Sequence, residues 1–215
     1  MLIESCAVPP FEKNGYVIGC PDTGDAIVLD PGDEVEQLIA LVRRLGVTVR
    51  YIMLTHSHLD HISGCIEAKA EWSVPLVLHR DDLFLYERAV QQGIAFGIRM
   101  RPQPPIDAWF DEQPDWTFGK FAVKAHHTPG HSPGQVCLQI GPTGAPGTDL
   151  FVGDTLFAGS IGRTDLPGGD LDTLLRSVRD VLFPLGDACR VYPGHGPATT
   201  IGRERLTNPF LDSVR

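Results

Sequence analysis

The stretch "LTHSHLDHISG", residues 54–64, places three of the chain's eight histidines beside one aspartate, at His56, His58, Asp60 and His61. Neutral imidazoles and a carboxylate add nothing to an apolar core, so their clustering needs another explanation. A polar loop that happens to be rich in histidine is the simpler interpretation, and a metal site is the more specific one. The rest of the sequence decides between them.

Length and composition indicate a folded protein with one domain over residues 1–215. Of the 215 residues 42% are hydrophobic and 21% are charged, which is ordinary for a globular protein. One domain is expected because single cores grow to about 250 residues before chains divide. The formal net charge of −9 argues against nucleic acid as a partner, since that binding depends on clustered Lys and Arg.

The amino-terminal segment and the cysteines indicate a cellular compartment. The segment "MLIESCAVPPFEKN" (1–14) has neither a positively charged nor a long apolar region, and no apolar run of 18 residues occurs. We therefore expect a cytoplasmic protein without a membrane partner. The five cysteines stand far apart without a Cys-x-x-Cys pair, so we expect buried free thiols rather than disulfides.

Apolar periodicity and turn residues predict alternating strands and helices. A hairpin is predicted where "YVIGC" (16–20) and "AIVLD" (26–30) flank a turn, and a helix follows with Asp33 and Glu36 at capping-box spacing. Residues 93–105 lack periodicity and are expected to form a surface loop that borders a site. The other predicted strands are 50–55, 74–79, 120–125, 135–140, 149–154 and 189–193, and the other predicted helices are 62–72, 81–92 and a last helix from Asp170 with Leu171, Leu174, Leu175, Val178 and Leu182 on its buried face.

This order of elements predicts an α/β (α+β) protein with two sheets and helices on their outer faces. Four of the apolar strands are followed by a histidine or an aspartate, since His131, Asp154 and His195 come after later strands as the first cluster comes after residues 50–55. Ligands in sheet proteins gather at loops that follow strand ends. The four strand ends are therefore expected to meet at one point.

The residue types at these strand ends suit metal chemistry. Neutral imidazole and carboxylate bind zinc, iron, manganese and cobalt, and the absence of cysteine ligands argues against a closed structural zinc site. His56 and His58 are two apart and can bind one ion together, whereas Asp60 and His61 turn toward a second. Seven groups are too many for one ion and suit two ions that share a carboxylate. The candidates are His56, His58, Asp60, His61, His131, Asp154 and His195.

Simpler interpretations exist for single members of this set. Asp60 alone is more often the N-cap of the helix that follows it, His195 alone is more often an ordinary loop histidine, and Asp154 alone is often a turn residue. The joint occurrence of all seven makes these interpretations improbable. His79, His126 and His127 have no spacing that suggests a metal and are expected to be structural.

Four motifs give the chain a family resemblance. The segments "THSHLDH" (55–61), "HTPGH" (127–131), "GDTLF" (153–157) and "YPGHGP" (192–197) together resemble the metallo-β-lactamase superfamily, and the likeness runs from about Tyr16 to the carboxyl end. Within it, "GRTDLPGGD" (162–170) and the segment 193–211 look like the short bacterial glyoxalase II-like hydrolases, which are similar to hydroxyacylglutathione hydrolase. The resemblance implies a four-layer αββα sandwich with two mixed sheets and outer helices.

The resemblance also implies roles for individual residues. Asp30 matches an aspartate that accepts the free N–H of a ligand histidine. Arg163 matches a basic residue that faces the glycine carboxylate of glutathione, although Asp165 stands where that family often has an aromatic residue, and a solvated surface charge is the alternative for Arg163. The implied first metal set is His56, His58 and His131, and the implied second set is Asp60, His61 and His195, with Asp154 bridging.

These observations lead to a hypothesis for the activity. We expect a metallo-hydrolase with two divalent ions, zinc first and iron or manganese as alternatives, that cleaves a small-molecule thioester such as S-lactoylglutathione by attack of a metal-bound hydroxide. Asp60 is expected to orient the nucleophile as well as to bind metal. The alternative is an oxidoreductase like the persulfide dioxygenases, which use one iron held by residues matching His56, His131 and Asp154. A lactonase, a β-lactamase or a metal-bearing binding module is supported by no feature of the sequence, which also leaves the oligomeric state open.

Overall fold

The structure, a computed structural model, describes residues 1–214, which form two six-stranded sheets and one short strand pair. In spatial order the first sheet contains β1 (Leu2–Cys6), β2 (Gly15–Gly19), β3 (Asp25–Leu29), β4 (Thr48–Met53), β5 (Leu76–Leu78) and β6 (Ala108–Trp109). The second contains β14 (Thr199–Thr200), β13 (Arg190–Pro193), β10 (Asp149–Gly153), β9 (Val136–Pro142), β8 (Phe121–His127) and β7 (Asp115–Phe118). The strand pair is β11 (Leu156–Phe157) with β12 (Ser160–Ile161).

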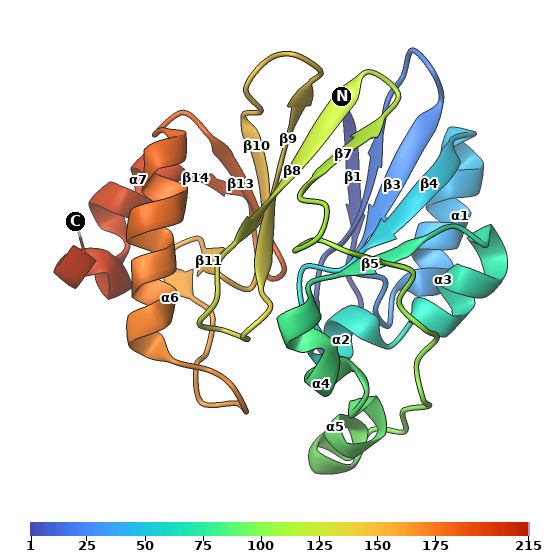
Figure 1. Ribbon diagram of the computed structural model, residues 1–215, viewed down its shortest axis with the longest axis horizontal. Helices are drawn as coiled ribbons and strands as arrows, with labels where there is room; N and C mark the ends of the chain where they lie inside the picture. The colour runs from blue at the N-terminus through green and yellow to red at the C-terminus, as the bar shows by residue number, and fades with distance from the viewer. Residues whose placement is uncertain (215) are drawn as a thin grey trace.

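Helices lie on the outer faces of the two sheets. The α-helices are α1 (Val35–Leu45), α2 (Leu59–Ile62), α3 (Cys65–Trp72), α4 (Leu83–Tyr86), α5 (Ala89–Phe96), α6 (Leu171–Ser177) and α7 (Ile201–Thr207). A π-helix, Val178–Leu182, continues α6, and 3₁₀-helices cover Arg80–Asp82, Phe183–Leu185 and Pro209–Val214. Figure 1 shows α1 and α3 outside the first sheet and α6 and α7 outside the second. The four-layer αββα sandwich implied by the resemblance is thereby confirmed.

Both sheets are mixed, as expected. In the first sheet β1, β2 and β3 pair antiparallel, and β3 to β6 pair parallel. In the second sheet β10 and β13 are parallel and the remaining pairs are antiparallel. Apolar side chains of both sheets, among them Ile27, Leu138 and Phe151, fill the space between them. Separate apolar clusters lie under the helices of each outer layer.

Predicted elements with several repeats of the apolar pattern are mostly confirmed. Tyr16 pairs with Leu29 and Gly19 with Ala26, so the predicted hairpin is present in antiparallel register. The helix α1 ends at Gly46, whose φ of 65° suits glycine as a C-cap. The predicted capping box is wrong, because Asp33 Oδ1 instead accepts a hydrogen bond from Ser63 Oγ at 2.6 Å. The segment before α1 packs on the loop after α2, and this contact takes the aspartate away from the helix end.

Three predicted elements differ from the structure. The helix predicted for 62–72 divides into α2 and α3 near Gly64, whose N–H donates to Pro31 O at 2.9 Å. The helix predicted for 81–92 is instead three short pieces, and the last of them, α5, occupies the first four residues of the loop predicted for 93–105. Leu171 was placed on the buried face of the last helix but is 47% exposed, because the first turn of α6 lies beyond the strand ends (Figure 1).

The cysteines agree with the expectation of free thiols. All five are unpaired in the structure, four are buried and Cys6 is half-buried. None of the helices within residues 1–214 is both long and apolar enough to cross a membrane. The buried thiols therefore act as small apolar side chains in the core.

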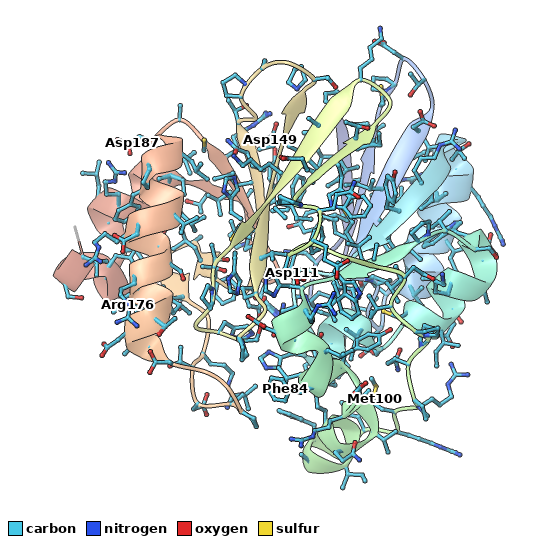
Figure 2. The ribbon with its side chains drawn as sticks, in the orientation of Figure 1. Phe84, Met100, Asp111, Asp149, Arg176 and Asp187 are labelled. Atoms are coloured by element: carbon cyan, nitrogen blue, oxygen red, sulfur yellow. The ribbon has the colours of Figure 1, made fainter. Side chains whose placement is uncertain are left out.

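The strand directions bring the four strand ends to one edge of the sandwich. Strands β8, β10 and β13 all run toward this edge, and β4 ends there in the first sheet. Asp149 marks the opposite end of β10 in Figure 2, and Phe84 lies on the side of the edge where α4 sits. Two backbone hydrogen bonds connect the loops at the edge, from Gly194 N to Gly153 O and from Val136 N to Thr55 O.

Candidate metal centre

The side chains predicted to bind metal converge at this edge. Within residues 1–214 the donor atoms of three overlapping sets of these side chains lie within 4.8 Å of one another. All seven predicted ligands are included, although the chain places them as far apart as residues 56 and 195. The sets are His56, His58 and His131; His56, His61 and Asp154; and Asp60, His61 and His195.

The first set presents three ring nitrogens to one point. His131 Nε2 lies 2.8 Å from His58 Nδ1 and 3.1 Å from His56 Nε2. Burial lowers the pKa of all three imidazoles, that of His58 to about 3, so each is neutral at ordinary pH. A neutral imidazole has one N–H and one lone pair, so the position of each proton decides what faces the centre.

Neighbouring groups fix two of these protons away from the centre. His131 Nδ1 donates to the carbonyl oxygen of Arg163 at 2.7 Å. His56 Nδ1 lies 3.1 Å from Thr55 Oγ1, whose own proton is donated to Asp30 at 2.7 Å. The Nε2 lone pairs of His131 and His56 therefore face each other, which is stable when a cation lies between them.

The second set combines two imidazoles with a carboxylate. Asp60 Oδ2 lies 3.2 Å from His195 Nε2 and 3.7 Å from His61 Nε2. Burial would lower the pKa values of both histidines, but Asp60 and Asp154 outweigh it and raise that of His61 to about 10 and that of His195 to about 9. The two carboxylates thus create a negative potential that a second cation satisfies.

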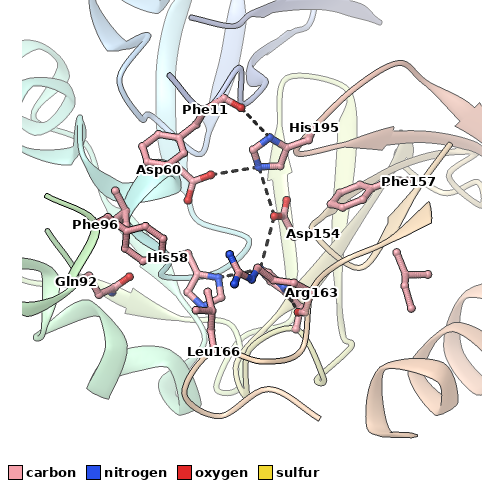
Figure 3. A pocket seen from close by; sticks show the side chains of 13 residues that line it. Phe11, His58, Asp60, Gln92, Phe96, Asp154, Phe157, Arg163, Leu166 and His195 are labelled. Carbon is pink, nitrogen blue, oxygen red and sulfur yellow. Dashed lines mark hydrogen bonds and ion pairs between the residues drawn. The ribbon is translucent and has the colours of Figure 1, made fainter. Parts of the chain in front are cut away.

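Asp154 lies between the two sets. Its Oδ2 is 3.6 Å from His131 Nε2 and 3.4 Å from His195 Nε2, and its Oδ1 is 3.4 Å from His61 Nε2. Figure 3 shows its carboxylate between the ring of His195 and the first set. Burial would raise its pKa, but His61 and His195 hold that pKa well below its usual range. Asp154 is therefore ionised and placed to be shared by two cations.

Unsatisfied atoms show that the site fits metal ions. His61 Nε2 and Asp154 Oδ1 are fully buried, and within residues 1–214 neither has a hydrogen-bond partner of ordinary geometry. Buried polar atoms in folded proteins nearly always have a partner. Converging imidazole lone pairs beside ionised carboxylates are the donor set that suits zinc, iron or manganese.

Comparison with known proteins assigns the family. The sequence model of the metallo-beta-lactamase superfamily matches residues 8–195. The chain belongs to the metallo-β-lactamase superfamily. It is 38% identical to hydroxyacylglutathione hydrolase GloC of Haemophilus influenzae over 99% of both chains.

Two solved structures of the superfamily are also similar over the whole chain. The BLEG-1 B3 metallo-beta-lactamase is 36% identical, with a TM-score of 0.89 over 98% of this chain and 100% of that one. TTHA1623, solved in a di-iron-bound form, is 37% identical, with a TM-score of 0.84 over 97% of this chain and 100% of that one. The protein is therefore an enzyme of the metallo-hydrolase superfamily.

Asp30 lies behind the metal-facing histidines, where the superfamily resemblance places it. Its carboxylate accepts hydrogen bonds from Thr55 N at 2.7 Å, Thr55 Oγ1 at 2.7 Å and His61 Nδ1 at 3.0 Å. Its backbone φ of 49° is rare for a residue with a side chain. The bond to His61 directs that ring's Nε2 toward Asp60 and Asp154.

Asp82 is a residue that the sequence analysis missed. Its buried carboxylate accepts hydrogen bonds from Ser57 N at 2.7 Å, Ser132 Oγ at 3.0 Å and Gly134 N at 2.6 Å. Ser57 separates two histidines of the first set, and Ser132 follows the third. Asp82 therefore joins the two loops that carry the first set, and its position after a predicted strand was the signal that could have found it.

The amino-terminal segment is a second missed contribution. The carbonyl oxygen of Phe11 lies 3.2 Å from His195 Nδ1, which leaves the Nε2 of that ring directed at the carboxylates (Figure 3). Lys13 is buried and bonds to Glu34 and to the backbone oxygen of Asp30. This ion pair holds the segment against the loop that contains Asp30.

Arg163, which was predicted to bind substrate, lines the cavity above the metal-facing side chains, and its guanidinium is paired with a carboxylate. Its Nε and Nη2 donate to Asp165 Oδ1 and Oδ2, both at 2.7 Å. The cavity has a volume of about 360 Å³. Its other lining residues are Phe11, His58, Leu59, Asp60, Gln92, Phe96, His131, Asp154, Phe157, Ile161, Leu166 and His195.

The histidines expected to be structural lie away from this cavity. The rings of His79 and His127 stack with centroids 4.1 Å apart and an interplanar angle of 11°. His127 Nε2 donates to Pro133 O at 2.7 Å, and His126 Nε2 bonds to Gln139 at 2.8 Å. Together with Asp81 the stacked rings of His79 and His127 form a further group whose donor atoms lie within 4.8 Å of one another, with Asp81 and His127 exposed and no shared member with the seven predicted ligands.

Proposed function

We propose that this protein hydrolyses a thioester with the help of two divalent metal ions. The observation that carries the proposal is the convergence of two complete donor sets on one shared carboxylate, within an open cavity. In this proposal the first ion binds His56, His58 and His131, the second binds Asp60, His61 and His195, and both bind Asp154.

The chemistry follows from this donor set. When bound, two cations would polarise a carbonyl group and lower the pKa of a water molecule to near neutrality. Burial would raise the pKa of Asp60, but His61 lowers it, so this carboxylate is ionised and able to hold a proton of the attacking water. Asp60 lines the cavity and therefore also orients that water toward the substrate.

The leaving group favours a thioester over an amide. A thiol has a pKa of about 8.5, so a thiolate departs without a proton donor, whereas an amide nitrogen has to take up a proton. Within residues 1–214 the cavity lining outside the proposed metal ligands is apolar apart from Gln92 and Arg163, so it adds no carboxylic acid or histidine as a further proton donor. This argument separates our proposal from β-lactam hydrolysis, which the likeness to BLEG-1 makes the alternative to test.

The proposed substrate class is a glutathione thioester such as S-lactoylglutathione. Support comes from the full-length relative that is named a hydroxyacylglutathione hydrolase. Arg163 at the cavity edge is a cation for a substrate carboxylate, with Asp165 as its competitor. We propose zinc as the metal, with iron or manganese as alternatives.

One assay panel tests the proposal. The purified protein, reconstituted separately with zinc, iron and manganese, is given S-lactoylglutathione, glutathione persulfide with an oxygen electrode, and a chromogenic β-lactam. We expect thioester hydrolysis with two metal equivalents bound per chain. Oxygen uptake with one bound iron would establish the persulfide dioxygenase alternative, which the intact second donor set disfavours. If the protein opens the β-lactam ring and hydrolyses no thioester, the β-lactamase alternative would be established.

A further inference from the structure

A second hollow adjoins the cavity above the metal-facing side chains. It has a volume of about 270 Å³ and shares His58, Gln92, Phe96 and Leu166 with the first cavity. Figure 3 places Gln92 and Phe96 on the His58 side of the site, away from His195. We name this hollow the side groove and define it by Leu85, Arg88, Ala95, Phe96, Leu166 and Pro167.

The side groove is mostly apolar. Besides His58 of the first donor set, its polar lining residues are Arg88, Gln91 and Gln92, and of these three only Arg88 carries a charge. Gln92 uses its amide nitrogen on Ser57 O and Leu85 O, both at 2.9 Å, so it anchors α5 to the first metal-facing loop. The groove is thus fixed in place relative to the reacting centre.

Arg88 is available for a ligand. Within residues 1–214 it has no carboxylate partner, and its guanidinium carbon lies 5.9 Å from the ring centroid of Phe84. Arg163 in the first cavity differs, since its Nε and Nη2 both donate to the carboxylate of Asp165. An unpaired guanidinium beside an apolar wall selects a ligand that offers an anion after an apolar stretch.

We propose that the side groove binds the part of the substrate remote from the scissile carbonyl, and that this part is an apolar chain ending in a carboxylate. The inference rests on the proposed thioesterase function and adds a second class of thioester to it, since neither the lactoyl group nor glutathione is an apolar chain. The chain lies between Phe96 and Leu166, and its carboxylate pairs with Arg88. Substrates with an uncharged distal end gain the apolar contact only.

Matched thioesters test the proposal with wild-type protein and Arg88→Gln. The first pair is the adipyl and hexanoyl thioesters of N-acetylcysteamine, with the charge on the acyl side. The second pair is the acetyl thioesters of 6-mercaptohexanoate and hexanethiol, with the charge on the thiol side. We expect Arg88→Gln to lower the charged-to-uncharged ratio of kcat/KM about fivefold in one pair, which identifies the side that occupies the groove.

Two further variants control this comparison. Arg176→Gln removes an equal charge from the outer face of α6 (Figure 2), and we expect it to leave both ratios unchanged. Phe96→Ala is expected to lower kcat/KM for both members of a pair, because it removes apolar surface and no charge. Unchanged ratios in both pairs with Arg88→Gln would overturn the proposal.

A binding measurement separates this inference from the proposed function. The thioethers S-(5-carboxypentyl)- and S-hexyl-N-acetylcysteamine cannot be hydrolysed, and calorimetry gives their dissociation constants. We expect Arg88→Gln to weaken only the carboxylate about fivefold, with the difference reduced at high salt. Failure to hydrolyse any thioester would refute the thioesterase, whereas equal weakening of both thioethers would refute the groove.

Discussion

The metal-facing floor of the cavity and the side groove differ in the structural elements that form them. We define the floor by its seven predicted metal ligands, which are His56, His58, Asp60, His61, His131, Asp154 and His195. The floor consists of side chains on loops that follow buried strands, and neighbours such as Asp30 and Asp82 hold those loops through several hydrogen bonds each. The side groove consists of short helical pieces and a loop, with Phe96 43% exposed. In our proposals the reaction chemistry lies on the loops that these hydrogen bonds hold, and substrate choice lies on the short helical pieces and the loop beside them.

The floor also concentrates charge that the fold alone does not balance. Two ionised carboxylates and five imidazoles lie within a few ångströms of one another with little solvent. The cations are therefore part of the folded structure as well as of the chemistry. The side groove holds one permanent charge, Arg88 at its exposed rim, and of its lining residues only His58 belongs to a donor set.

Removal of metal is expected to have the largest effect, and it should affect the floor more than the side groove. We expect chelation to abolish activity and to lower Tm by about 10 °C or more, since a ligand at 1,000 times its Kd contributes about 4 kcal/mol. Calorimetry of the chelated and zinc-restored protein measures the effect. Binding of the uncharged thioether in the side groove should survive mild chelation, and an unchanged Tm on full metal removal would contradict the account of the floor.

Asp60→Ala tests whether a single side chain of the floor is needed for catalysis. We expect kcat to fall about 1,000-fold, because the variant loses the group that holds and orients the attacking water. The Asp60 carboxylate interacts with His61 and His195 of the same donor set, and we expect the fold of the variant to persist by circular dichroism. Full activity with unchanged metal content would remove Asp60 from the mechanism, and Asp33→Ala is the matched control on the neighbouring loop.

Asp82→Asn tests whether the floor depends on its supports. Asparagine places an amide N–H₂ where the carboxylate now accepts from two backbone N–H groups, so one of these bonds is lost. We expect about 10–100-fold weaker metal affinity and about 2–3 kcal/mol less free energy of unfolding.

Asp81→Asn provides the control for that variant. Asp81 is the adjacent residue, its side chain is 58% exposed, and it makes no hydrogen bond to either metal-facing loop. We expect its substitution to change the free energy of unfolding by less than about 0.5 kcal/mol. Equal effects at positions 81 and 82, measured by metal titration and denaturant unfolding, would show that the loops do not rely on the buried carboxylate.

The difference between the floor and its surroundings also explains which residues of the site can be predicted from the sequence. His131, Asp154 and His195 are predictable because each follows an apolar strand, and parallel strand ends meet at one edge. Asp82 also follows a predicted strand, but Arg80 and Asp81 beside it give the segment the character of a charged surface. Only the packing shows that Asp82 is 0% exposed.

Other contacts in the site cannot be predicted from the types of side chain in the sequence. Phe11 directs His195 through its backbone oxygen, which every residue possesses. The short helices α4 and α5 divide a segment whose periodicity predicts one helix, and Gln92 of α5 bonds both to Ser57 O in the first metal-facing loop and to Leu85 O in α4. Long periodic segments such as β8 and α1 are predictable, whereas tertiary contacts decide these short ones.

Asp165→Asn is expected to have the smallest effect and the opposite sign. The Arg163–Asp165 pair is surface-exposed, with side chains 54% and 68% accessible, so it competes only weakly with a ligand. Removing its carboxylate leaves Arg163 free, and we expect KM for S-lactoylglutathione to fall about threefold while kcat stays constant, because the floor is untouched. Arg163→Gln should raise KM to a similar extent, and the double variant should match Arg163→Gln alone. If Asp165→Asn also lowers KM in the Arg163→Gln background, Asp165 acts on the substrate directly. Competition between Asp165 and the substrate for Arg163 would then not explain the effect.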